Sequence, residues 1–279
     1  MQVLLDPSPA VWLSHVEPLL LQAEAENNLL LGLAAQAVND PERFGQGLTL
    51  ARTVDGSTVV GAAMVNQYNL ILSRQPDAAL AALAERLDDP SVTIPGTLGP
   101  DDVPERFAQH WFDRTGRYGT LRQSMRIHDC RTVEPIAVAP GRFRAPQESE
   151  VPTLAEWRIA FNEAINSTVL DDDPAAAVRR MMESRDLVVW EHDGQIVSCA
   201  ATARKTPHGA VVAFVYTPLE HRSCGYATSC VAELTRTRLA AGARFCCLYT
   251  DLANPISNAI YARIGYRRVC DSAWWSIES

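Results

Sequence analysis

One short pattern occurs twice along the chain at a fixed distance. Residues 53–64, TVDGSTVVGAAM, align without a gap with residues 191–202, EHDGQIVSCAAT, at an offset of 138 residues. The two stretches share an Asp-Gly pair, one valine and two adjacent alanines. Each predicts a strand, a hairpin turn at Asp-Gly and a second strand. A hairpin repeated so far along the chain indicates that the protein contains two related halves.

A second repeat follows the first in the same order. FDRTG at 112–116 corresponds to YARIG at 261–265, and each predicts a helix that ends at a glycine in the left-handed conformation. Two repeats in one order favour an internal duplication over coincidence. Residues 132–149 lie between the halves and contain three prolines, which predicts a connector or an edge segment. We therefore expect one domain at 1–133 and another at 142–279.

The second half predicts an alternation of strands and helices after an antiparallel hairpin. Such an order is typical of an α/β protein with a mixed sheet, and the first half follows it more loosely. The expected helices are 151–165, 173–184, 225–241 and 254–264, and the expected strands are the hairpin 187–206, then 209–217, 244–251 and two short strands within 266–277.

The loop HRSCGYA, residues 221–227, lies between a predicted strand and a predicted helix. The first turn of a helix leaves backbone N–H groups without partners, and the helix dipole adds positive charge there, so the site favours an anion. Gly225 lets an anion approach the main chain, Ala227 is small, and Arg222 can contact a phosphate. The loop contains neither a GxGxxG motif nor a P-loop. A plain helix start whose glycine only makes the turn fits the same residues.

The helix predicted at 254–264 carries a polar stripe. Asn254 is a good N-cap and is followed by proline at the first helical position. The helical period places three isoleucines, Ile256, Ile260 and Ile264, on one face, with Asn254, Ser257 and Tyr261 beside them. A phenol at the edge of a buried face can bind a ligand or donate a proton. It can equally pack its ring and leave its hydroxyl in water.

Together, residues 215–227 and 254–266 resemble the GNAT superfamily of acyl-CoA N-acyltransferases. That superfamily carries Arg or Gln, two variable residues, Gly, one variable residue, and then Gly or Ala, and Arg222, Gly225 and Ala227 match this pattern. Its later segment of Asn, Tyr and a Gly-aromatic pair is matched by residues 254, 261 and 265–266. The resemblance covers about residues 142–279. It implies two tandem GNAT-like domains, each a splayed, mostly antiparallel sheet flanked by helices, with acetyl-CoA as cosubstrate of the second.

The resemblance also implies roles for individual residues. The backbone of residues 215–217 would pair with the pantetheine arm, the amides of 222–227 would hold the pyrophosphate, and Tyr261 would protonate the departing thiolate. Acceptor-binding residues in this family come from the region that is here about 154–208. The implied cofactor-binding set is Val215, Tyr216, Thr217, Arg222, Ser223, Cys224, Gly225, Tyr226, Ala227, Asn254 and Ser257.

The sequence does not identify the general base. No carboxylate lies on the 211–217 strand, so Asp251, Glu163 and a relayed water stay open. The first half lacks the cofactor parts, because QPDAALAALAERL follows its strand YNLILSR without a glycine and Phe112 stands in place of the tyrosine. We expect this half to be a scaffold or a wall of the substrate cleft.

Composition narrows the class of partner. The formal net charge of −8 argues against nucleic acid, no apolar run is long enough to span a membrane, and the N-terminus does not resemble a secretory signal. The seven cysteines lack paired metal-type spacings, which predicts no metal site and free thiols in the cytoplasm. The sequence thus predicts an acetyltransferase for a primary amine of a small molecule, monomeric or homodimeric. A protein or peptide acetyltransferase and a catalytically silent acyl-CoA-binding module are the alternatives.

Overall fold

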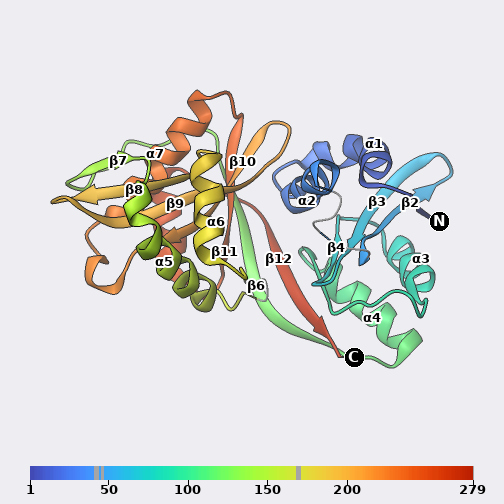
Figure 1. The fold of residues 1–279 in the computed structure, drawn as a ribbon. Helices are drawn as coiled ribbons and strands as arrows, with labels where there is room; N and C mark the ends of the chain where they lie inside the picture. Colours follow the sequence, from blue (N-terminus) through green and yellow to red (C-terminus); the bar gives the residue numbers. More distant parts are fainter. Residues whose placement is uncertain (41–43, 45–46, 168–170, 279) are drawn as a thin grey trace. The chain divides into compact units, whose positions relative to one another are not determined.

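The computed structural model describes residues 1–40, 44, 47–167 and 171–278 (Figure 1). The chain forms two compact units. The first consists of Met1–His128, Tyr249–Asn254 and Arg268–Ser279, and the second of Asp129–Leu248 and Pro255–Arg267. This division differs from the predicted linear halves, 1–133 and 142–279, because two C-terminal segments pack within the first unit. None of the helices in the described ranges has the length and hydropathy required to cross a bilayer.

The first unit contains a mostly antiparallel sheet. Its strands follow the order β1-β2-β3-β4-β5-β12, in which only β4 and β5 are parallel neighbours. The C-terminal strand completes this sheet, since Ser272–Ser276 of β12 pair with Gly96–Pro100 of β5. Its elements are β1 (Gln2–Leu5), α1 (Pro9–Leu20), η1 (Leu21–Ala23), α2 (Asn28–Asn39), β2 (Thr49–Asp55), β3 (Thr58–Val65), β4 (Leu70–Leu72), α3 (Asp77–Leu87), β5 (Gly96–Pro100) and α4 (Val103–Thr115).

The second unit repeats this plan. Its strands follow the order β7-β8-β9-β10-β11, antiparallel except for the parallel pair β10 and β11. Strands β6 (Gly119–Cys130), β11 (Phe245–Asp251) and β12 (Arg267–Ile277) have residues in both units. The other elements are β7 (Arg142–Arg144), η3 (Glu148–Glu150), α5 (Val151–Ala164), α6 (Pro174–Glu183), β8 (Leu187–His192), β9 (Gln195–Lys205), β10 (Gly209–Tyr216), η4 (Leu219–His221), α7 (Tyr226–Ala240) and α8 (Pro255–Ile264). The expected mixed α/β fold is confirmed.

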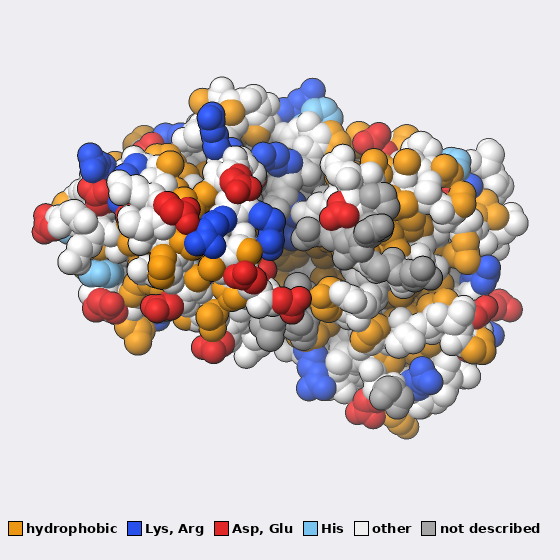
Figure 2. All heavy atoms as spheres, viewed as in Figure 1, with side chains coloured by type: hydrophobic (Ala, Val, Ile, Leu, Met, Phe, Trp, Pro, Cys, Tyr) orange, Lys and Arg blue, Asp and Glu red, His pale blue; other side chains and the backbone are white. Residues whose placement is uncertain are grey.

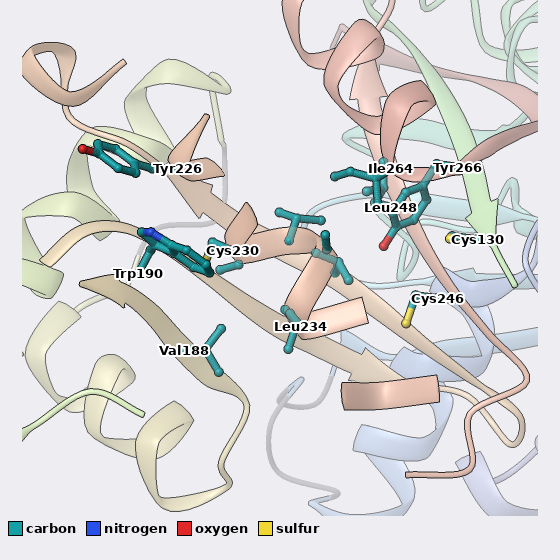
Figure 3. Packing of buried hydrophobic residues seen from close by; sticks show 14 of the residues in the cluster. Cys130, Val188, Trp190, Tyr226, Cys230, Leu234, Cys246, Leu248, Ile264 and Tyr266 are labelled. Carbon is teal, nitrogen blue, oxygen red and sulfur yellow. The ribbon is translucent and has the colours of Figure 1, made fainter. Parts of the chain in front are cut away.

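Both faces of each sheet are buried by helices. Successive strand residues point to opposite faces, so Leu187 and Val189 of β8 pack with α5 and α6, whereas Val188 and Trp190 pack with α7 (Figure 3). The first unit does the same, with Met64 facing the cluster of α1 and α2 and Val65 facing that of α3 and α4. The apolar alternation therefore gives a helix-sheet-helix sandwich in each unit.

The two sequence repeats are confirmed as structural equivalents. β2 and β3 form one hairpin, β8 and β9 form the other, and each has a register shift close to its turn. Gly116 follows α4 with φ +72° and Gly265 follows α8 with φ +115°. The turns differ by one position, because β8 and β9 are joined by Asp193 and Gly194 but β2 and β3 by Gly56 and Ser57.

Candidate active site

Strand β10 changes register where the family's cofactor arm is expected. Ala213 pairs with Ala201 of β9, but the next paired residue is Tyr216, opposite Cys199, so Phe214 and Val215 form a bulge. Phe214 is fully buried and has φ +47°, which is unusual for an aromatic residue. The described pairing of β10 with β11 covers only Gly209–Val211. The strand therefore leaves regular pairing with β9 at residues 214–215, which overlap the predicted positions 215–217 at Val215.

A buried serine holds the end of this strand. The hydroxyl of Ser198 on β9 donates to Tyr216 O at 3.1 Å and lies 2.8 Å from Thr217 Oγ1. Because Ser198 uses its one proton on Tyr216 O, the hydroxyl of Thr217 donates to Ser198. Ser198 is fully buried, so both bonds form in a low-dielectric setting that favours them. The backbone at 216–217 is thus fixed from the neighbouring strand.

Residues 222–227 form an open loop at the start of α7. Ser223 and Gly225 both have positive φ, +65° and +81°, and Gly225 is the N-cap of the helix. A glycine has no side chain with which to cap the first turn, and no side-chain capping bond is present. The N–H groups of that turn therefore point at a common region beyond the helix end, together with the positive end of the helix dipole.

The glycine at 225 is required by backbone conformation more than by space. A Cβ built there would come within 3.7 Å of Ala139 Cβ, an ordinary contact, whereas φ +81° is strained for residues other than glycine. Arg222 Nε donates to Thr217 O at 3.0 Å, which ties the loop to the residue that follows β10, while the arginine side chain stays exposed. Cys224 is exposed and Tyr226 is buried against Trp190. The loop can therefore bind an anion through its backbone.

Tyr261 lies on α8 against the core of the second unit. Its ring is half-buried and meets that of Tyr266 edge-on at 5.8 Å between centroids. Burial raises the pKa of Tyr261 to about 12. At neutral pH the phenol is protonated, as an ordinary tyrosine also is, and carries a proton that it can donate. The isoleucine face expected on this helix is only partly correct. Ile264 is fully buried and Ile260 packs on the core, but Ile256 in the first turn is 73% exposed.

The remaining predicted residues are less closely tied to the loop. Asn254 and Asp251 belong to the first unit, where Asp251 accepts from Ala253 N at 2.7 Å and Gln123 Nε2 at 3.1 Å. Ser257 lies in the first turns of α8, which begins at the proline after residue 254, as expected. Glu163 is exposed near the end of α5. Within the predicted acceptor region, residues 168–170 lie outside the described residues.

The corresponding loop of the first unit is closed by side chains. After β4, Ser73 Oγ accepts from Ala62 N at 2.9 Å, and Gln75 Oε1 accepts from Thr53 Oγ1 at 3.2 Å. Pro76 is the N-cap of α3, and Asp77 places a carboxylate in the first turn of that helix. A negative charge at this end opposes the binding of an anion. The expected loss of the cofactor loop therefore has a structural basis.

Basic and acidic side chains are mixed on the surface of the second unit. On the face drawn in Figure 2, Lys and Arg alternate with Asp and Glu over the region of α5 and α6. Two ion pairs lie on or next to these helices: Arg158 Nε lies 2.8 Å from Asp171 Oδ2, and Arg179 Nε lies 2.8 Å from Glu148 Oε1. This face is not the uniformly basic surface that nucleic-acid binding favours.

Comparisons with known proteins agree with this geometry. Residues 151–266 match the model of the Acetyltransferase (GNAT) family. None of the curated proteins matches the sequence. Among solved structures, a GNAT-family acetyltransferase from Colwellia psychrerythraea is 12% identical over 100% of both chains, with a TM-score of 0.62. A GCN5-related N-acetyltransferase from Sphaerobacter thermophilus is 14% identical over 98% of this chain and 94% of that chain, with a TM-score of 0.58.

A further solved structure shares the two-part organisation. A tandem GNAT protein from the clavulanic acid biosynthesis pathway is 15% identical over 98% of both chains, with a TM-score of 0.54. At such identities the shared property is the fold. Residues 151–266 are thus a GNAT-family domain, and the whole chain has the fold of tandem GNAT proteins. The resemblance read from residues 215–227 and 254–266 is confirmed.

Two residues of the site were missed by sequence reasoning. Ser198 is a hydroxyl in an otherwise apolar strand segment, IVSCAA, and a buried serine of this kind needs a partner, which was the available signal. Nothing in the sequence indicates the bulge at Phe214, because an aromatic residue in an apolar run predicts a regular strand and not a bulge with positive φ.

Proposed function

We propose that the protein is an N-acetyltransferase that moves an acetyl group from acetyl-CoA to a primary amine of a small molecule. One observation carries the proposal: the open 222–227 loop, with two positive φ angles and an uncapped helix start, follows a bulged strand inside the segment that matches the GNAT family. Backbone donors of this kind suit a pyrophosphate, and an open strand edge suits an extended arm.

The residues of the second unit supply the groups that the cosubstrate requires. The amides of residues 223–227 and the Arg222 guanidinium bind the phosphates. The backbone of 215–217, held by Ser198, pairs with the pantetheine arm, as a strand added to the sheet edge. Acetyl-CoA supplies the thioester carbon that the amine attacks. The loop conformation is what makes these residues suitable for acetyl-CoA. No side chain of the described residues caps the first turn of α7, so its N–H groups are left to bind the phosphates.

Proton transfer needs an acid and a base. Tyr261 is protonated at neutral pH, and we propose that it donates this proton to the leaving thiolate. Glu163 and Asp251 are the two side-chain candidates for the base that keeps the amine neutral. The remaining rate acceleration comes from positioning, because a neutral amine held beside a thioester reacts as if it were highly concentrated.

The test is the release of free CoA thiol when the purified protein is mixed with acetyl-CoA and a panel of small primary amines, polyamines and peptides. We expect turnover with at least one small amine and none without an amine. Turnover with peptides alone would instead indicate a peptide acetyltransferase. Binding of acetyl-CoA without turnover on any panel member would indicate a silent binding module.

A further inference from the structure

The segment that joins the two sequence halves packs tightly on the second unit. We call residues 132–141 the connector. At its beginning, Glu134 N donates to Ile264 O at 2.9 Å, at the end of α8, and Glu134 Oε1 lies 3.2 Å from Arg267 Nη2. Gly265 permits this approach, since a Cβ there would lie 2.7 Å from Thr132 O. The connector is therefore fixed to the helix that carries Tyr261.

The far end of the connector reaches the start of α7. Ala139 N donates to Ser229 Oγ at 2.8 Å, and Ser229 is 1% exposed in the first turns of that helix. The carbonyl of the next residue, Pro140, accepts from Trp190 Nε1 at 2.9 Å. Ala139 Cβ is the one atom of the described residues, chain neighbours aside, that a Cβ at Gly225 would meet within 4 Å. The connector is thus bonded to the first turns of α7 and leaves room for little more than one added methyl group beside the N-cap.

Both ends share one hydrophobic cluster with the site. Val133, Ile136 and Ala139 pack on the same buried cluster as Tyr261 and the core residues of α7. Figure 3 shows Tyr226 and Trp190 together at one end of this cluster and Ile264 with Tyr266 at the other. One continuous segment therefore contacts the helix of the 222–227 loop and the helix of the acid.

We propose that the connector is a positioning element for acetyl-CoA: through Ala139 and Ser229 it holds the 222–227 loop in the conformation that binds the phosphates. This inference rests on the proposed function. A loop with positive φ at Ser223 is strained by about 1 to 3 kcal/mol and persists only where its surroundings fix it. Residues 222–225 are exposed, so few of their own contacts can do so. The connector is bonded to Ser229, whose own N–H donates to Gly225 O at 3.0 Å.

The test compares two deletions of a buried hydroxyl in the same helix. Ser229→Ala removes the acceptor of the Ala139 N–H. Thr235→Val removes a hydroxyl that is equally buried and further along α7, but that bonds to Val231 O and lies 2.8 Å from Tyr266 Oη instead of bonding to the connector. Titration calorimetry should give a dissociation constant for acetyl-CoA about tenfold higher in Ser229→Ala, as expected for one lost buried hydrogen bond. The constant should be unchanged in Thr235→Val.

A second readout uses the protein without ligand. Amide hydrogen exchange of a peptide that covers 222–228 should be faster in Ser229→Ala than in the parent and unchanged in Thr235→Val. In Ser229→Ala, kcat at saturating acetyl-CoA should stay within about twofold of the parent, because the connector acts on binding and not on the chemical step.

Three outcomes distinguish a failure of the connector's role from a failure of the proposed function. Equal affinity and equal exchange in the parent and Ser229→Ala would overturn the role of the connector, and so would equal losses in the two variants. If the parent itself bound no acetyl-CoA, the proposed function would fail. The exchange of 222–228 would then still decide whether the connector fixes the loop.

Discussion

The loops that follow β4 in the first unit and β10 in the second show how one fold can keep or lose a cofactor site. Both strands follow a hairpin, pair in parallel with the next strand and lead into a helix. β4 has three residues and no bulge, whereas β10 has eight and bulges at Phe214. The first loop is bonded back to the hairpin strands through Ser73 and Gln75 and places the Asp77 carboxylate at the helix start, whereas the second leaves the backbone of 222–227 open.

The parallel strands of the first unit stay close together at Leu72 and Gly99. In the first unit, Gly99 allows Leu72 to come so close that a Cβ at 99 would lie 2.9 Å from Leu72 O. Just past this point Arg74 pairs with Glu26 and Asp101, at 2.9 and 2.6 Å. In the first unit, ion-paired side chains thus lie just past the end of β4. The difference therefore lies in the loop residues and in the bulged end of β10, within two sheets that pair their strands in the same way.

The largest effect is expected from Tyr261→Phe, which gives the second unit the residue type found at Phe112. Loss of the acid should lower kcat about 10² to 10⁴-fold with little change in acetyl-CoA affinity. Since burial raises the pKa of Tyr261 to about 12, the parent should not lose activity through this group between pH 7 and 10. Steady-state kinetics across that pH range check both points. Undiminished turnover in the variant would remove the assigned role.

Gly225→Val tests the backbone of the open loop. A β-branched residue is strained at φ +81°, so the loop should shift and affinity for acetyl-CoA should fall about 10 to 100-fold. Gly116→Val is the matched control, because Gly116 has φ +72°, has nothing within 4 Å of a built Cβ and belongs to the first unit. Titration calorimetry should find the control unchanged, and an equal loss in both variants would contradict the account.

Acid should weaken the first unit through its C-terminal strand. Arg126 donates to Asp271 of β12 at 2.6 and 3.1 Å and lowers the pKa of that carboxyl to about 2. A carboxyl whose pKa is lower in the folded than in the unfolded state stabilises the fold at pH values above its unfolded pKa. This stabilisation, here about 1 to 2 kcal/mol after screening, is lost as the pH falls towards 2. Urea unfolding at pH 7, 4, 3 and 2.5 should show this loss beyond that of Asp271→Asn. Identical pH dependence in the two proteins would rule out the contribution.

The smallest effect concerns the closed loop. Asp77→Asn removes the carboxylate at the start of α3, which pairs with His110 at 3.2 Å and Arg106 at 3.5 Å. The pairs are exposed and the dipole effect is modest, so stability should fall by less than about 1 kcal/mol. Acetyl-CoA binding should be unaffected in affinity and stoichiometry. Appearance of a second site in this variant would mean that one charge alone had closed the first unit.

The sequence predicted the fold and the loop because both depend on local signals. The Asp-Gly hairpins, the glycines at 116 and 265 and the pattern of Arg222, Gly225 and Ala227 specify turns and helix ends through backbone conformation alone.

Features that depend on distant pairing were not predictable from local signals. The pairing of β12 with β5 joins residues far apart in the chain, and nothing in SAWWSI indicates it. Residues 132–149 were predicted to be a connector or an edge segment, and their contacts to Ser229 and Ile264 were not predictable because they come from tertiary packing. The prediction that Ile256 lies on a buried face was wrong for a different reason. The helical period identifies the apolar face of α8, but it does not show how far along the helix the core covers that face.

The most direct test of the comparison is the stoichiometry of acetyl-CoA binding, measured by titration calorimetry on the parent chain and on Gly225→Val. The account predicts one site per chain in the parent, and a dissociation constant for that site raised about 10 to 100-fold by the substitution. Two sites per chain, or one site with unchanged affinity in Gly225→Val, would contradict it, because the first unit would then bind the cosubstrate that its closed loop is held to exclude.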